Sequence, residues 1–138
     1  MKKLGKLLFF AAMAALLTCL LCVALNATQY SGNCGKNGNN VTWSLDTETG
    51  VLKIEGEGAM RDYSYMGAPW YCYLEYIENV KVGEGITNIG NSTFVHCSSI
   101  TNVTIPETVT RIGDYAFNQC HGLKEIYQVY KCSKHFNA

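Results

Sequence analysis

One pattern of apolar residues returns after 23 positions in the second half of the chain, and this repeat restricts the fold more than any other feature. The residues between the repeated positions differ between the two copies. Such a pattern is expected when a chain winds into a stack of similar coils whose recurring residues face inward. The repeated positions are Ile89 and Ile112, Gly90 and Gly113, Phe94 and Phe117, and Cys97 and Cys120.

Local patterns predict how each coil is built. Val80 and Val82 alternate with polar residues, which is typical of a short strand with one buried face. Residues 86–89 read as a second extended piece, and the glycine that follows ends it where the chain turns. Asp114 then opens the stretch "DYAFNQC" as a good helix N-cap residue. We therefore expect each coil to hold two short strands and a short helical turn.

The segment before the repeats predicts a β-hairpin. Apolar and polar residues alternate on both sides of a turn that ends at Gly50, as in two paired strands. A hairpin here would cover the apolar end of the stack, which a solenoid otherwise exposes. The alternating apolar residues are Val41, Trp43 and Leu45 before the turn and Leu52 and Ile54 after it.

The repeat resembles the BspA-type leucine-rich repeats of bacterial and some protist surface proteins. Units of that family run from Ile-Gly through Ala-Phe and Cys to Ile-Pro, and this chain matches them over residues 77–127. The resemblance implies a leucine-rich-repeat solenoid, mostly β with short helical turns, preceded by a hairpin cap. It also implies a non-catalytic protein, secreted or at the cell surface, that binds protein or glycan ligands in adhesion. The matching residues include Ile89-Gly90, Phe94, Cys97, Ile105-Pro106, Ile112-Gly113, Ala116-Phe117 and Cys120.

The first 27 residues have the order of an export signal. Lys2, Lys3 and Lys6 precede an apolar run over residues 7–25, and Ala27 is an acceptable cleavage point. The run is longer than the roughly 7–15 residues of a usual signal core, so an uncleaved membrane anchor stays open as an alternative. The lysines place the remaining chain outside the cell in either case.

The sequence divides into four segments, and the last of them departs from the repeat. Gln128 falls where a second copy of Ile105 is expected, so the pattern stops in mid-coil. An alternative function follows: a structural cap or truncated fragment that associates with a longer repeat protein, or with itself, through its carboxyl end. The segments are 1–27 (signal), 28–70 (hairpin cap region), 71–127 (repeats) and 128–138 (irregular tail).

Charge argues against nucleic-acid binding. The full chain balances 11 basic and 11 acidic residues, but three lysines belong to the leader, which leaves 8 against 11. Nucleic-acid-binding domains usually show a clustered basic face. No nucleophile, P-loop or zinc-protease pattern is present either, so we expect no enzyme activity and no cofactor.

Cysteines and histidines beside each other raise the question of a zinc site. Cys97 and Cys120 neighbour His96 and His121, but both cysteines occupy an inward repeat position while the histidines are not equivalent. We therefore interpret the two thiols as packing residues and expect no metal. A disulfide between Cys34 and Cys72 stays open, because no spacing rule fixes connectivity.

Two sets of outward residues are candidates for ligand contact. The first is the aromatic group Tyr63, Tyr65 and Tyr73, which could instead pack the joint between the hairpin and the first coil. In that alternative, Tyr71 occupies the position of Phe94. The second set comprises variable outward positions of the coils, such as Lys81, Thr104 and Tyr127.

Overall fold

The computed structural model describes residues 28–129. The predicted leader and its cleavage point lie outside the described residues, as do residues 130–138 with Cys132. Within the described part, no helix is both long and apolar enough to cross a membrane.

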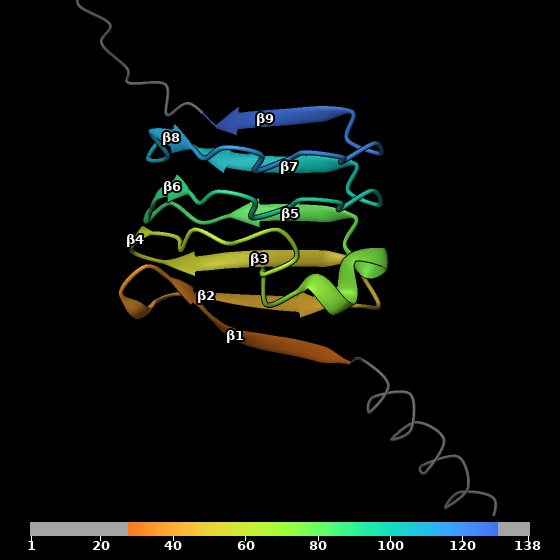
Figure 1. The fold of residues 1–138 in the computed structure, drawn as a ribbon, viewed down its shortest axis with the longest axis horizontal. Helices are drawn as coiled ribbons and strands as arrows, with labels where there is room; N and C mark the ends of the chain where they lie inside the picture. Colours follow the sequence, from red (N-terminus) through yellow and green to blue (C-terminus); the bar gives the residue numbers. More distant parts are fainter. Residues whose placement is uncertain (1–27, 130–138) are drawn as a thin grey trace, which may run out of the picture.

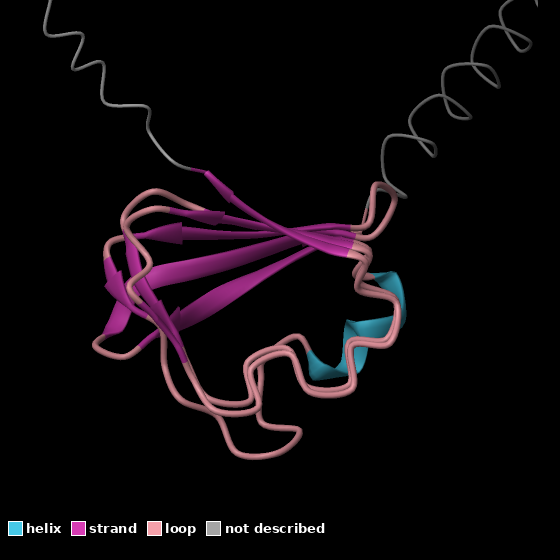
Figure 2. Ribbon diagram, turned by 90° about the horizontal axis from the view of Figure 1, so that it is seen from above, coloured by secondary structure: helices cyan, strands magenta, loops and turns pink. Residues whose placement is uncertain are grey.

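Two sheets form the walls of a stack of coils, as the solenoid prediction requires. Figure 1 shows the strands one above another, and Figure 2 looks along the stack, with the larger sheet on one side and loops returning on the other. The larger sheet has the order β1 (Gln29–Gly35), β2 (Gly38–Asp46), β3 (Val51–Gly56), β5 (Asn79–Val82), β7 (Asn102–Pro106) and β9 (Glu125–Val129). The smaller sheet has the order β4 (Gly58–Ala59), β6 (Ile86–Ile89) and β8 (Arg111–Ile112).

The predicted hairpin is confirmed. Strands β2 and β3 pair antiparallel, with Trp43 opposite Ile54 and Leu45 opposite Leu52, and all four side chains are buried. A further strand, β1, is not predicted from the sequence and pairs antiparallel with the other edge of β2. Its inward side includes Gly32 in place of a large apolar residue, so the alternation that marks a strand is weak there.

The stack begins within the hairpin. Strand β3 pairs in parallel with β5, and Leu52 lies opposite Val80. Strands β5, β7 and β9 continue in parallel, with Val80 opposite Val103 and Val103 opposite Ile126. This is the register that the 23-residue repeat predicts. Strand β9 runs to Val129, so the first two residues assigned to the irregular tail belong to a strand.

The predicted helical turns of the second and third coils are not formed. Tight turns replace them, and Ser92, His96, Tyr115 and Gln119 have positive φ angles between 51° and 63°. A residue with positive φ cannot continue a right-handed helix. These turns instead let successive coils bond to each other: the N–H groups of residues 92, 94 and 96 donate to the carbonyl oxygens of residues 114, 116 and 118. Among the described residues, the first coil alone has a helical segment, the 3-10 helix Tyr71–Tyr76.

A stack of aromatic rings fills the core opposite the larger sheet. The ring of Phe94 lies 5.5 Å from Trp70 on one side and 5.2 Å from Phe117 on the other. The expectation that Tyr71 occupies this position is wrong, because Trp70 fills it and is fully buried. Trp70 and Phe94 are 24 positions apart, so a count of 23 residues falls one residue short here. The first coil as a whole is longer than the repeat, since Leu52 and its partner Val80 are 28 positions apart. The indole N–H of Trp70 donates to the carbonyl oxygen of Thr93 over 3.1 Å.

The glycines after the second strand of each coil serve close packing between coils. A Cβ atom on Gly90 would lie 2.0 Å from the carbonyl oxygen of Arg61, and one on Gly113 would lie 2.4 Å from Oδ1 of Asn91. Neither glycine has a positive φ angle. The repeat therefore requires glycine because the preceding coil approaches so closely, and not because the turn needs an unusual backbone conformation.

Candidate ligand-binding face

The larger sheet presents one open side, which we call the outer face: the side of β1, β2, β3, β5, β7 and β9 that points away from the core. Along β2, β3, β5 and the first four residues of β7, buried residues alternate with exposed or half-buried ones, so every second side chain reaches this face. Lys81, Thr104 and Tyr127, the predicted outward positions, lie directly opposite one another on β5, β7 and β9. The structure therefore brings them into one row across the sheet.

This row continues into the hairpin. Lys53 on β3 lies opposite Lys81, and Ser44 on β2 lies opposite Lys53. Neighbouring strands are about 4.8 Å apart, so the row from Ser44 to Tyr127 spans four strand spacings, about 19 Å. Sequence reasoning missed the hairpin residues of the row because it treated the hairpin as a cap. The alternation in residues 41–54 was the signal that could have identified them.

A second row of polar residues runs beside the first. It includes Asp46 on β2, Asn79 on β5 and Asn102 on β7, and the Asn102 side-chain N–H donates to Oδ1 of Asn79 over 3.1 Å. The Asp46 carboxylate accepts the N–H groups of Glu48 and Thr49, at 2.9 and 3.2 Å. The hydrogen bond from Thr49 is the main reason that the pKa of Asp46 lies below its usual value, and Lys53 lowers it further.

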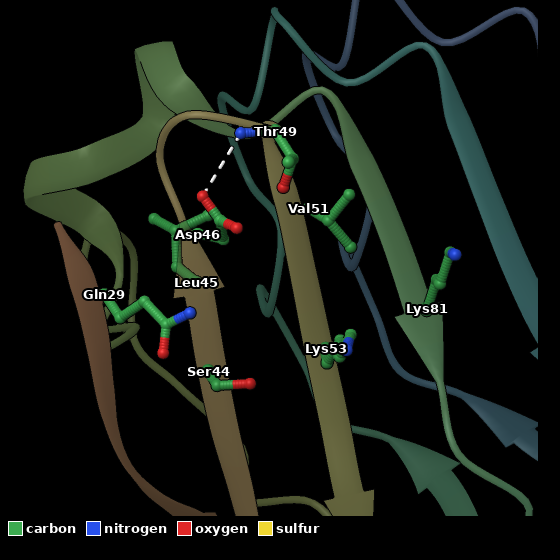
Figure 3. Close-up of a pocket in the computed structure, with 8 residues that line it drawn as sticks. All are labelled: Gln29, Ser44, Leu45, Asp46, Thr49, Val51, Lys53 and Lys81. Carbon is green, nitrogen blue, oxygen red and sulfur yellow. Dashed lines mark hydrogen bonds between the residues drawn. The ribbon is translucent and has the colours of Figure 1, made fainter. Parts of the chain in front are cut away.

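A hollow lies on the outer face, where the hairpin meets the second coil. It has a volume of about 410 Å³, and Figure 3 shows its lining side chains along β1, β2, β3 and β5. Two shallower hollows, of about 190 and 310 Å³, lie on the same face. The lining residues of the 410 Å³ hollow are Gln29, Ser44, Leu45, Asp46, Thr49, Val51, Lys53 and Lys81.

The repeated cysteines lie on the inner side of the coils, away from this face. Cys97 is fully buried, and Cys120 is half-buried with its thiol directed at the carbonyl oxygen of Phe94, 3.0 Å away. Burial raises the pKa of Cys120 to about 11, and burial raises the pKa of Cys97 still more. His96 contacts the ring of Tyr65 instead of a cysteine. Within residues 28–129, no three histidine, cysteine or acidic side chains lie close enough to hold a metal ion.

Cys34 and Cys72 do not form the disulfide that the sequence left open. Both thiols are free, and Cys34 is buried whereas Cys72 is exposed. The ring of Tyr73, next to Cys72, stacks on Tyr30 near the start of β1 with centroids 4.0 Å apart. Cys34 lies four residues beyond Tyr30, about 13 Å further along β1, on the buried side of that strand. Burial raises the pKa of Cys34 to about 12.

The three candidate tyrosines have different environments, and the structure does not bring them together on the outer face. Tyr63 and Tyr73 are half-buried and pack against the core, as the alternative for this group expects. Tyr63 lies edge-on to Trp70, with centroids 6.0 Å apart. Tyr65 is 56% exposed, and its hydroxyl is hydrogen-bonded to Nε2 of His96. The assignment of these tyrosines to ligand contact stays a prediction.

Comparisons with known proteins agree with this geometry. The protein-family model described as "BspA type Leucine rich repeat region (6 copies)" matches residues 63–135, which is more than half of the chain. The chain belongs to the BspA-type leucine-rich repeat family. Its fold is the mostly-β repeat fold that the sequence predicts. A search of the curated proteins found no match.

A solved structure supports the same conclusion. The crystal structure of a leucine-rich repeat protein from Eubacterium ventriosum is similar, with a TM-score of 0.67 and 36% sequence identity. The similarity covers 74% of this chain and 26% of that protein. The chain thus spans about a quarter of the length of this relative.

Proposed function

We propose that this BspA-type repeat protein is a non-catalytic binding module, secreted or held at the cell surface, whose outer face binds a protein or glycan ligand. One observation carries the proposal: the residues that vary between coils, Lys81, Thr104 and Tyr127, lie in register on an open sheet face with hollows. Side chains that vary on a fixed scaffold are suited to ligand recognition, because they change the surface and leave the core intact.

The location outside the cell rests on the leader. Its lysine-flanked apolar run is the sequence feature that favours export, and family resemblance to surface proteins favours adhesion as the biological role. Fractionation of the expressing cell, with mass spectrometry of the amino terminus, tests this. Recovery of the chain from the cytoplasm with an intact leader would contradict export.

A substitution in the middle of the outer face tests the binding function. Purified full-length protein is applied to arrays of immobilised glycans and extracellular proteins, beside the variant Thr104→Arg. Thr104 lies between Lys81 and Tyr127, so a bulky side chain there is expected to abolish binding of the ligand that the array identifies. Ser98→Arg, at an exposed loop position away from this sheet, is the matched control and should bind normally. Equal binding by all three proteins would contradict the use of this face.

A second candidate function rests on the other end of the stack. Ile112 on β8 and Ile126 on β9 are 48% and 47% exposed, whereas their equivalents one coil earlier, Ile89 and Val103, are fully buried. Such residues favour association, through the carboxyl end, with a second copy or with a longer repeat protein. Sedimentation of the purified protein over a range of concentrations distinguishes the two functions. A stable monomer supports the binding module, and concentration-dependent association that Ile126→Glu prevents supports the cap.

A further inference from the structure

Two lysines face each other where the hairpin meets the second coil. Lys53 and Lys81 are directly opposite on the parallel strands β3 and β5, and both side chains reach the outer face, as Figure 3 shows. Like charges in directly opposite positions of a sheet destabilise it. The equivalent positions in the next two coils hold Thr104 and Tyr127, so the repeat itself does not require a lysine. A local cost without a structural reason is typical of a functional site.

The hollow beside the lysines carries a net positive charge. Its lining includes both lysines and a single carboxylate, that of Asp46. This carboxylate already accepts two backbone N–H groups at the turn between β2 and β3. Glu55, the next outward residue along β3, lines the neighbouring hollow together with both lysines, so its carboxylate offsets part of their charge on that side. A bound anion would therefore find two ammonium groups that the protein's own acidic groups only partly neutralise.

The surroundings of the lysines suit a sugar ring. Ser44, Thr49 and Gln29 in the same lining offer hydroxyl and amide groups, which are the hydrogen-bonding partners of sugar hydroxyls. Two strands beyond Lys81, the ring of Tyr127 is 52% exposed, and its hydroxyl donates to the carboxylate of Glu125. This hydrogen bond restrains the ring, and a restrained aromatic ring on a sheet face offers a flat apolar surface for a pyranose.

We propose that the outer face binds a saccharide that carries a carboxylate or sulfate group, with this anion between Lys53 and Lys81. The sugar chain extends from the hollow along the row toward Tyr127. This inference rests on the proposed function and names the ligand class of the same face. An ammonium group makes charge-assisted hydrogen bonds to either kind of acid, so both acids share the required chemistry.

The test compares ligands that differ only in charge. Titration calorimetry of the full-length protein uses oligogalacturonate, its methyl ester, κ-carrageenan oligosaccharides (a sulfated galactan without carboxylates), their desulfated form, and polyglutamate. At least one of the two acidic saccharides is expected to bind about tenfold or more tightly than its neutral counterpart, because one lost charge contact corresponds to about a tenfold change in affinity. The acidic saccharide that binds identifies the source of the anion. Binding of polyglutamate with equal affinity would overturn the saccharide assignment in favour of an acidic peptide.

Substitutions then separate a binding lysine from an ordinary surface lysine. Lys81→Thr, which installs the residue of the next coil, is expected to weaken binding of the acidic saccharide about tenfold. The same change removes the like-charge pair, so the Tm of the free protein should rise by about 1–4 °C. Lys36→Thr makes the same charge change at an exposed position in the turn between β1 and β2, and it should alter neither quantity.

The outcomes distinguish this inference from the proposed function. If Lys81→Thr binds the acidic saccharide as tightly as Lys36→Thr does, the lysine pair is not the anion site and the inference is wrong. If a neutral saccharide binds and Thr104→Arg abolishes its binding while Lys81→Thr does not, the proposed function stands and this inference falls. If no acidic saccharide binds better than its neutral form, the inference also falls, and the array experiment with Thr104→Arg still decides the proposed function.

Discussion

The second coil and the last described coil use the same repeat positions with different results. In the second coil, Ile89, Phe94 and Cys97 are fully buried. In the last coil, Ile112 is 48% exposed, and Phe117 and Cys120 are only half-buried. The side chains are of the same kind, but coils cover the first set on two sides and cover the second set on one side within the described residues. Burial in this fold therefore comes from the neighbouring coil and not from residue type alone.

The hairpin explains why the other end of the stack is closed. Trp43 of β2 lies edge-on to Trp70 of the first coil, with ring centroids 5.7 Å apart. Strands β1 and β2 also extend the larger sheet, so the edge of β3 that would otherwise be free is paired. The hairpin thus supplies both the apolar contacts and the hydrogen bonds of a further coil.

The sharpest test of this comparison uses the stacked phenylalanines. Phe94→Ala is expected to lower the free energy of unfolding by about 3–5 kcal/mol, as truncation of a fully buried aromatic residue commonly does. Phe117→Ala removes the same atoms from a half-buried position and should cost about 1–2 kcal/mol, because less apolar surface is lost from the core. Urea unfolding followed by circular dichroism measures both values.

A third variant controls for damage unrelated to the aromatic stack. Tyr115→Ala truncates an aromatic side chain that is 71% exposed in the last coil, so it should change stability by less than about 0.5 kcal/mol. Equal costs for Phe94→Ala and Phe117→Ala would mean that both coils are covered to the same extent in solution. The comparison between the coils would then be wrong.

The repeat glycines extend the comparison from side chains to the backbone. Gly90→Ala is expected to destabilise the protein by about 1–3 kcal/mol, because its Cβ would collide with a carbonyl oxygen of a coil that is itself packed on both sides. Gly113→Ala meets a similar collision with Asn91, but the last coil can shift outward and should lose less.

Gly38→Ala separates collision from backbone conformation. Gly38 has a φ of 86° and open space where a Cβ would lie, so alanine there incurs conformational strain without a collision. Thermal unfolding of the three variants ranks them. A Gly90→Ala protein as stable as the unaltered chain would mean that the coils are not held as closely as the structure places them.

The residues that point inward made most of the fold predictable. Val80, Val103 and Ile126 recur at the spacing that places them side by side, because parallel coils of equal length must align equivalent residues. The strand β1 was missed because Gly32 interrupts its apolar alternation. The helical turns were wrongly predicted because Phe117 and Cys120 have helical spacing, and hydrogen bonds between coils override that local preference.

The candidate site was predictable only in part, since outward residues carry no periodic signal. Lys81, Thr104 and Tyr127 were identified because the repeat marks which positions face outward. Lys53 was missed, since its place beside Lys81 depends on the parallel pairing of β3 with β5, and that pairing has an offset of 28 residues instead of 23. A longer first coil therefore concealed the two-lysine junction from any argument based on the repeat.

The smallest expected effect concerns the two thiols of the repeat. Burial raises the pKa of Cys97, and the nearby thiol of Cys120 raises it further. A thiol whose pKa is higher in the folded state leaves stability unchanged below its unfolded pKa of about 8.5, and stability is lost as pH rises above that value because the unfolded chain releases the proton first. Between pH 8.5 and 10, Cys97 should therefore steepen the loss of unfolding free energy by up to about 1.4 kcal/mol per pH unit.

Cys97→Ala should remove this slope, whereas Cys120→Ala, at a half-exposed position, should remove less of it. Urea unfolding measures the change of unfolding free energy with pH, at pH 7.5, 8.5, 9.3 and 10, ~0.8 pH units apart on average. The cavity that each alanine substitution leaves lowers stability equally at every pH, so it does not affect this slope. Identical slopes for the unaltered protein and Cys97→Ala would show that Cys97 is open to solvent, contrary to its place between two covering coils.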